Sequence, residues 1–194
     1  MLFRSAAKAA AKALEAAGAV VEEMKSWLTQ EMFDGMARFF EARSNYDLRR
    51  LPPARRAKVL PFIAEWCTWR ADAYTGDDVM GGYGAYVALR ETTVRATLPY
   101  DFVISPTSPI LPYEAELPAP GNDPRNAFPH IAFTLPYNMS EQPAASLNWT
   151  FSAKEKLPIG VQVIGRRFDD LGVLRVSRFL EQARPAQRAW PDPR

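Results

Sequence analysis

Residues 160–167 come close to a phosphate-binding motif. Gly160 and Gly165 have the spacing of G-x-x-x-x-G-K-[ST], but Arg166 and Arg167 stand where that motif has lysine and a hydroxyl residue that holds magnesium. The residues between the glycines are Val-Gln-Val-Ile, whereas a phosphate loop needs small, flexible residues whose N–H groups can curl around an anion. This stretch therefore predicts a β-strand over residues 159–164 and no nucleotide site.

Cys67 and His130 are the only residues of their types, and together they could form a thiolate–imidazole pair. Cys67 lies between Trp66 and Trp69, where a small buried core residue is expected, and His130 follows a proline-rich stretch that favours a structural or pocket-lining role. A single cysteine excludes both a disulfide framework and a cysteine-based zinc site within the chain. We therefore predict no catalytic residue, no metal and no organic cofactor.

The composition limits the classes of protein to which this chain can belong. The chain has 194 residues, is 47% hydrophobic and 12% aromatic, and carries a formal net charge of +2, so it can bury one core but has no strong charge excess for nucleic acid or an anionic membrane. No stretch approaches the roughly 20 apolar residues of a spanning helix. The single cysteine fits a cytoplasmic location. The basic, alanine-rich start resembles a transit peptide, but a surface helix over residues 5–17, closed by Gly18, is the favoured interpretation.

The first half is predicted to be mostly helical. Helices are expected over residues 29–43, 55–74 and 85–97, with a short strand at 19–23. A glycine-rich turn is expected at 81–84, as a flexible link or as the entry to the next helix. Four arginines surround the double proline of residues 49–56; such a cluster can bind phosphate, but a solvated linker is the favoured interpretation.

The second half predicts strands and one helix. A buried strand at 101–105 ends at Pro106, and residues 144–151 and 159–164 form a hairpin. The loop between the first strand and the hairpin, residues 106–129, contains seven prolines. It either lines a site or is a flexible loop on the surface. Asp169 or Asp170 caps a helix at 171–183, for which the expected inward face is Leu171, Leu174, Phe179 and Leu180.

Three ordered motifs carry a family resemblance. They are Asp101-Phe-Val-Ile-Ser-Pro-Thr107, the run from Phe133 to Ser146 (FTLPYNMSEQPAAS), and the run from Leu157 to Asp170 (LPIGVQVIGRRFDD). Together they resemble the C-terminal part of the amidase signature family, and the alanine-rich helix with its GAVVEE segment resembles the family's middle section. Glu141 stands where the family often has glycine.

This resemblance implies an α/β fold with a mixed β-sheet covered by helices on both faces. Residues 1–194 would form a single partial amidase domain, with residues 1–100 mostly helical and including one early strand, and residues 101–194 containing a strand, the proline-rich loop, the hairpin and the last helix. It also implies amide hydrolysis by a Ser–Ser–Lys triad, in which a neutral lysine acts as base. The glycine- and serine-rich run that carries this triad is absent from the sequence, so we expect the chain to be inactive alone.

Three hypotheses follow for the function. The chain is the tail of an amidase separated from its catalytic half, one half of a split amidase, or a non-catalytic binding module. Expected partners are a small-molecule amide in the complete enzyme, the N-terminal catalytic half, and a second copy of the chain through self-association. The resemblance points to Asn138 and Gln142 as substrate-pocket residues, with holding the turn between loop and strand as the alternative.

Overall fold

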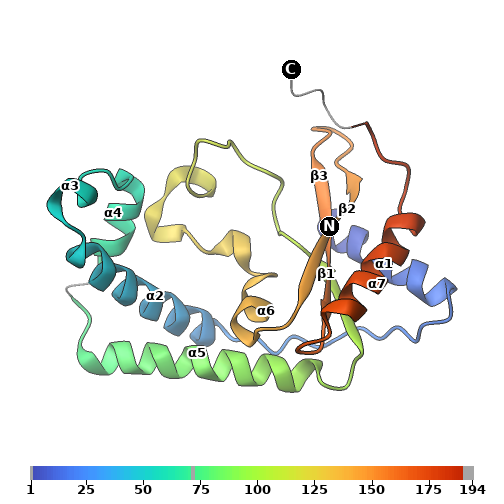
Figure 1. Ribbon diagram of the computed structural model, residues 1–194, viewed down its shortest axis with the longest axis horizontal. Helices are drawn as coiled ribbons and strands as arrows, with labels where there is room; N and C mark the ends of the chain where they lie inside the picture. The colour runs from blue at the N-terminus through green and yellow to red at the C-terminus, as the bar shows by residue number, and fades with distance from the viewer. Residues whose placement is uncertain (1, 71–72, 190–194) are drawn as a thin grey trace. The chain divides into compact units, whose positions relative to one another are not determined.

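A computed structural model describes residues 2–70 and 73–189 (Figure 1). Contacts divide these residues into two compact units. We call residues 2–25, 97–112 and 141–189 the sheet unit, and residues 26–70, 73–96 and 113–140 the helical unit. That the whole chain forms one partial domain stays a prediction.

The sheet unit is built on three antiparallel strands. They are β1 (Phe102–Pro106), β2 (Ala144–Phe151) and β3 (Pro158–Gly165), in the order β1-β3-β2. The register places Ser105 of β1 and Ser146 of β2 opposite Gln162 of β3. The predicted hairpin and the α/β fold class are confirmed, although the described strands pair only in antiparallel fashion where the resemblance implied a mixed sheet.

Two helices of this unit, α1 (Leu2–Ala16) and α7 (Asp170–Ala183), pack on the same face of the sheet (Figure 1). Ile159, Val161 and Val163 are every second residue of β3, and their side chains lie on this face, because alternate residues of a strand lie on the same side of the sheet. Opposite them, Ala6 and Ala10 of α1 are buried. Because alanine has a minimal side chain, it lets the helix backbone approach the sheet closely.

The predicted inward face of α7 was partly wrong. Leu180 is fully buried, but Leu171 and Leu174 are 57% and 62% exposed. The face that packs on the sheet consists instead of Val173, Ser177 and Leu180, spaced four and three residues apart. The helix carries apolar residues on two stripes, so hydrophobic spacing alone did not determine which stripe is buried.

The strand predicted at residues 19–23 does not form. This segment has no regular secondary structure, and Val20 is 91% exposed. A strand needs a hydrogen-bonded neighbour, and β1, β2 and β3 pair with one another within residues 2–70 and 73–189. The helix before it is confirmed, with Gly18 following its end at a φ of 98°, the left-handed conformation that glycine adopts without strain.

The helical unit contains helices of very different length. They are α2 (Gln30–Arg50), α3 (Pro53–Arg56), α4 (Pro61–Thr68), α5 (Gly76–Thr97), whose last residue lies in the sheet unit, and α6 (Leu135–Ser140), with 3-10 turns at Pro120–Asn122, Pro124–Asn126 and Pro129–Ile131. The helix predicted over 55–74 is split because Leu60, before Pro61, is extended, and a proline disfavours helical geometry at the residue before it. The proline-rich loop is held on α4 by the edge-on contact of Phe128 with Trp66, whose ring centroids are 5.6 Å apart.

Residues 81–84, predicted to form a turn, lie inside α5. The glycines serve a close approach between α2 and α5 instead. A Cβ on Gly82 would lie 2.8 Å from the carbonyl oxygen of Gly35, and a Cβ on Gly35 would lie 2.3 Å from Cβ of Ala85. The core beside this crossing contains Met36 and Leu89, both fully buried.

A buried carboxylate ties α2 to the chain that follows α4. Glu41 is 4% exposed and accepts two hydrogen bonds from Arg70, at 2.9 and 3.2 Å, and one from the hydroxyl of Tyr74 at 2.5 Å. Burial, and then the hydrogen bond to Glu41, raise the pKa of Tyr74 to about 12. The neutral phenol is therefore the form that the folded state favours.

This geometry predicts a stability change at alkaline pH. Because the folded pKa of Tyr74 lies above the ordinary value of about 10, its contribution is complete below pH 10 and is lost as the pH rises toward 12. The free energy of unfolding, measured by urea denaturation across this range, should fall more steeply for the native chain than for Tyr74→Phe. Equal slopes for the two proteins would show that Tyr74 does not titrate as proposed.

Candidate functional site

The three sequence motifs meet on the face of the sheet opposite α1 and α7. Ser105 lies in β1, Thr107 directly follows this strand, Ser146 lies in β2 and Gln162 in β3. We call these four residues the hydroxyl–amide row. Thr107 Oγ1 and Ser146 Oγ are 2.9 Å apart, and Gln162 Nε2 donates to Ser105 Oγ at 3.0 Å. Residues up to 57 positions apart in the sequence thus place polar side chains side by side.

Gly160 makes room for this row. A Cβ at this position would lie 2.8 Å from Thr107 Oγ1, and 3.3 Å from Ser146 Oγ. The main-chain N–H of Thr107 donates to the carbonyl oxygen of Gly160 at 3.2 Å, which fixes the threonine beside the strand. Gly160 therefore leaves room for a threonine side chain, and it is not part of a phosphate-binding loop.

The hydroxyl–amide row was not predicted from the sequence, although a signal for it exists. Ser105 and Thr107 are two residues apart, as are Gly160 and Gln162, and residues two apart on a strand share a face. Hydroxyl and amide groups can donate and accept hydrogen bonds but do not ionise near neutral pH. The row can therefore orient an amide group, while it supplies no general base for proton transfer.

Gln142 bonds the last residue of β3 to the last residue of α5, and both of these residues belong to the sheet unit. Its Nε2 donates to the carbonyl oxygen of Gly165 at 2.9 Å and to Thr97 Oγ1 at 3.2 Å. The preceding residue, Glu141, has a φ of 60°, in the left-handed region that glycine adopts without strain. This conformation accounts for the glycine that the family pattern often has there, and it supports the turn-holding alternative for Gln142.

Asn138 lies in α6 of the helical unit. Its side chain is exposed, and its main-chain N–H donates to the carbonyl oxygen of Thr134 at 3.1 Å. A role for Asn138 and Gln142 in contacting substrate stays a prediction.

Replacing Gln142 by methionine tests its structural role. Methionine keeps the length of the side chain but leaves the Gly165 carbonyl and the Thr97 hydroxyl without this donor, which should cost about 1–3 kcal/mol. Urea denaturation of the full chain measures the loss. Asn138→Met is the matched control, because its side chain is exposed, and it should change stability by less than about 0.5 kcal/mol. Equal effects would argue against the turn-holding role.

The surroundings of Cys67 and of the lysines disfavour a reactive thiolate and a neutral lysine base. Burial, and then the charge of Asp47, raise the pKa of the Cys67 thiol, which disfavours the reactive thiolate. His130 packs edge-on against Tyr113, with ring centroids 5.9 Å apart, and no described contact joins it to Cys67. All six lysines are exposed, whereas a neutral lysine base requires desolvation.

The described part of the chain offers neither a metal site nor a membrane span. Residues 2–70 and 73–189 contain no cluster of three or more His, Cys, Asp or Glu side chains placed to hold a metal ion. Over the same residues no helix is both long and apolar enough to span a bilayer.

Comparison with known proteins identifies the family. The family model described as Amidase matches residues 3–174. A glutamyl-tRNA(Gln) amidotransferase subunit from Alkaliphilus metalliredigens is 30% identical, over 90% of this chain and 40% of the relative. The solved structure of the corresponding Thermotoga maritima protein has 26% identity and a TM-score of 0.63, over 94% of this chain and 39% of that one. A 6-aminohexanoate cyclic dimer hydrolase has 25% identity and a TM-score of 0.68, over 94% and 41%.

The chain thus spans about 40% of the length of these relatives. Within that span, the matched residues include all three motifs that meet on the sheet. The chain belongs to the amidase signature family.

Proposed function

We propose that this chain forms the substrate-facing wall and part of the sheet of an amide hydrolase, with the nucleophile and base on a catalytic half outside its 194 residues. The hydroxyl–amide row carries this proposal. It gathers hydrogen-bonding groups from all three family motifs, and Thr107 and Ser146 lie 2.9 Å apart there, with no ionisable partner among the described residues. The substrate class is a small-molecule amide, which such groups can orient.

Three observations support placing the chemistry on the catalytic half. The sequence contains no glycine- and serine-rich Ser–Ser run, the lysines are exposed, and the pKa of the Cys67 thiol is raised. In the complete enzyme a serine would attack the amide carbonyl, a second serine would relay its proton, and a neutral lysine would accept it. We place this enzyme in the cytoplasm, as the single cysteine suggests.

The test is to join the chain to the catalytic half of an amidase. The N-terminal part of the Alkaliphilus metalliredigens relative, up to the aligned region, would be fused to residues 1–194 in one polypeptide. Release of aniline from an anilide and of ammonia from aliphatic amides would be measured for the fusion, for each part alone, and for the fusion with its nucleophilic serine replaced by alanine. Hydrolysis by the unchanged fusion alone supports the proposal. Hydrolysis by the isolated chain, or a folded but inactive fusion, contradicts it.

Exposed apolar side chains on the sheet unit favour a covering partner. Phe168 is 92% exposed, and Leu171 and Leu174 at the start of α7 are 57% and 62% exposed. Such a patch favours association in water.

The isolated chain is therefore expected to self-associate. Light scattering coupled to size exclusion should show species larger than the 21.8 kDa chain, increasing with concentration. Leu171→Gln with Leu174→Gln should shift the distribution toward the monomer, because both side chains are exposed and their replacement leaves the core unchanged. A monodisperse monomer in the unchanged chain would refute this expectation.

A further inference from the structure

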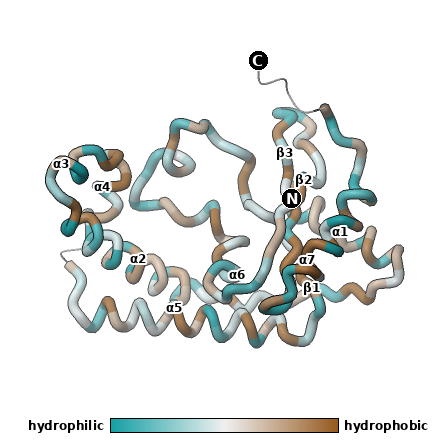
Figure 2. The backbone as a smooth tube through the Cα atoms, in the orientation of Figure 1, coloured by the Kyte–Doolittle hydropathy of each residue, from teal (hydrophilic) through white to brown (hydrophobic). Residues whose placement is uncertain are grey.

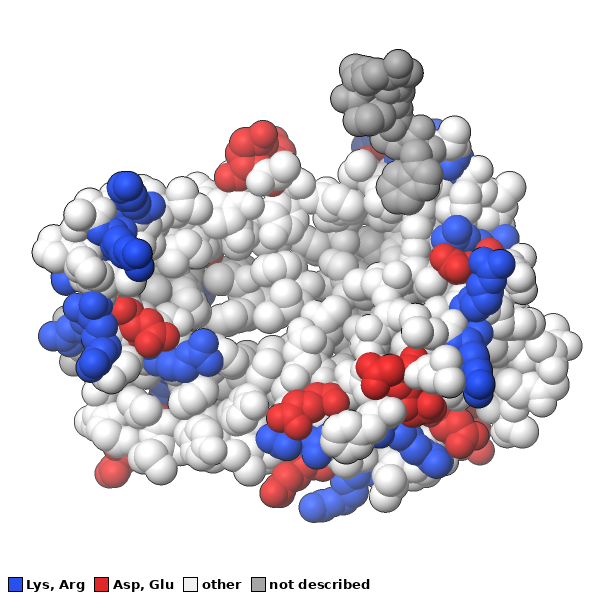
Figure 3. Space-filling view, viewed as in Figure 1, with Lys and Arg blue, Asp and Glu red and all other residues white. Residues whose placement is uncertain are grey.

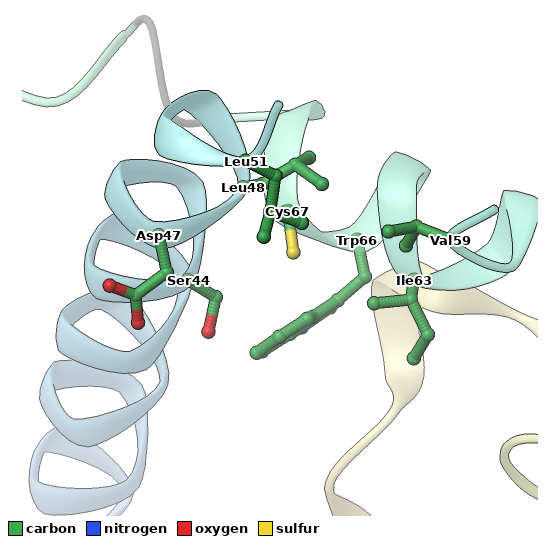
Figure 4. A pocket seen from close by; sticks show the side chains of 8 residues that line it. All are labelled: Ser44, Asp47, Leu48, Leu51, Val59, Ile63, Trp66 and Cys67. Carbon is green, nitrogen blue, oxygen red and sulfur yellow. The ribbon is translucent and has the colours of Figure 1, made fainter. Parts of the chain in front are cut away.

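A second surface, in the helical unit, combines an apolar recess with excess positive charge. The recess is about 240 Å³ in volume and is formed by the end of α2, the following link and α4 (Figure 4). We call it the α2–α4 groove. It is lined by Ser44, Asp47, Leu48, Leu51, Val59, Ile63, Trp66 and Cys67.

The groove results from the break after α2. Leu51 is extended, which the following proline favours, so the chain leaves the helix axis and returns as α4. Leu48 and Cys67, at 8% and 3% exposure, are its most buried lining residues, while Trp66 extends from α4 toward Ser44 (Figure 4). In Figure 2 the hydrophobic positions of α4 adjoin the hydrophilic positions of α3.

Positive side chains lie on the chain segment that joins the two walls of this groove. Between residues 44 and 60 there are five basic residues against one acid, Asp47, and Figure 3 shows blue side chains gathered over α3 and the end of α2. The basic residues, which we call the basic loop, are Arg49, Arg50, Arg55, Arg56 and Lys58, and all are exposed.

Arg56 and Arg50 have local structural contacts. Arg56 donates to the carbonyl oxygens of Arg49 and Leu51, at 3.4 and 3.3 Å, which stabilises the break in the chain. Arg50 lies over the ring of Tyr46, 4.9 Å from its centroid. Within the part of the chain that the structure describes, Arg55 and Lys58 have no acidic partner within ion-pair distance. Their positive charge is therefore available to a ligand.

We infer that the α2–α4 groove and the basic loop together bind an acidic segment of a partner protein. One large apolar side chain of that segment would fill the groove, and carboxylates beside it would pair with Arg55 and Lys58. The volume is below the roughly 300–1,000 Å³ of pockets for drug-sized molecules, which favours a side chain over a free small ligand. Charge complementarity around an apolar centre is the pattern of protein interfaces.

The shape of this surface distinguishes a protein from a membrane or nucleic acid. Membrane binding uses apolar side chains that project into the lipid, whereas Leu48, Ile63 and Cys67 line a recess. Nucleic-acid binding relies on contacts to phosphates and on flat side chains that stack on the bases, and an apolar recess provides neither. The favoured partner is therefore a peptide segment.

Selection from random peptides tests this inference on the full chain. Phage-displayed dodecapeptides would be selected on the immobilised protein, and an enriched peptide would be synthesised with a fluorescent label for polarisation measurements. The expected peptides carry carboxylates beside an aromatic or branched apolar residue. The charge reversal Arg55→Glu with Lys58→Glu should weaken binding at least tenfold, about 1.4 kcal/mol.

Lys12→Glu with Lys154→Glu is the matched control. It makes the same change in net charge at exposed sites outside the groove and should alter binding less than twofold. Val59→Glu, which puts a charge into the groove, should abolish binding while circular dichroism shows an unchanged fold.

Four results would overturn the inference. The first three are the absence of any enriched peptide, enriched peptides without carboxylates, and peptide binding that the Arg55/Lys58 charge reversal leaves unchanged. The fourth is that the native chain binds equimolar phosphatidylcholine–phosphatidylserine vesicles or duplex DNA and that the charge reversal abolishes this binding. The last result would assign the surface to a membrane or a nucleic acid.

Discussion

Replacing Leu180 by alanine should destabilise the chain by about 2–5 kcal/mol, among the largest single effects expected here. Leu180 is fully buried on α7 and packs with Val161 and Val163 of the central strand and with Val173 of its own helix. Truncation removes the transfer free energy of the side chain and leaves a cavity, which backbone hydrogen bonding in the sheet prevents from closing completely. Urea denaturation followed by far-UV circular dichroism measures the change.

Leu174→Ala is the control for this prediction. It removes the same atoms from the same helix, but Leu174 is 62% exposed, so the expected change is within about 0.5 kcal/mol. The pair of variants distinguishes the stripe that the structure buries from the stripe that hydrophobic spacing suggested. Similar losses for both variants would show that α7 packs through Leu174 as well, and would contradict the described face.

The second large effect is expected at the crossing of α2 and α5. Alanine at Gly35 would place its Cβ 2.3 Å from Cβ of Ala85, so one backbone must move. Overpacking of this kind costs about 1–3 kcal/mol, more than the roughly 0.5–1 kcal/mol that alanine gains over glycine in a helix. The free energy of unfolding of Gly35→Ala should therefore decrease.

Two further variants make this test specific. Gly35→Ala combined with Ala85→Gly moves the methyl group to the other helix, and should recover most of the lost stability. Gly84→Ala, at a position in α5 where a Cβ meets nothing within 4 Å, should stabilise the chain by about 0.5–1 kcal/mol. If Gly35→Ala proved as favourable as Gly84→Ala, the close helix crossing would be refuted.

Local signals in the sequence predicted much of the sheet unit. Asp169 caps α7 by accepting a hydrogen bond from the N–H of Gly172, and β-branched alternation marked β3 correctly. The predicted strand at 19–23 failed because a strand depends on a neighbour that local sequence does not specify. The glycines at 81–84 were interpreted as a turn, since their purpose, a crossing with α2, involves residues far away along the chain.

For the candidate site, too, the sequence alone predicted only some of the features that the structure shows. The resemblance pointed to Asn138 and Gln142, whose contact with substrate stays a prediction, and the structure shows Gln142 bonded to Thr97 and Gly165. The hydroxyl–amide row became visible only with the strand register, which sets Ser146 opposite Gln162. Register is a tertiary property, because it depends on which strands pair, and spacing within one strand indicates only which residues share a face.

In the function that we propose, this chain shapes an amide site whose nucleophile lies on another part of the enzyme. The most direct measurement treats the fusion of chain and catalytic half with a fluorophosphonate, which forms a covalent bond with an activated serine, and locates the adduct by peptide mass spectrometry. We predict one adduct, on a serine of the catalytic half, and none on residues 1–194. An adduct on Ser105, Ser146 or any other residue of this chain would contradict it.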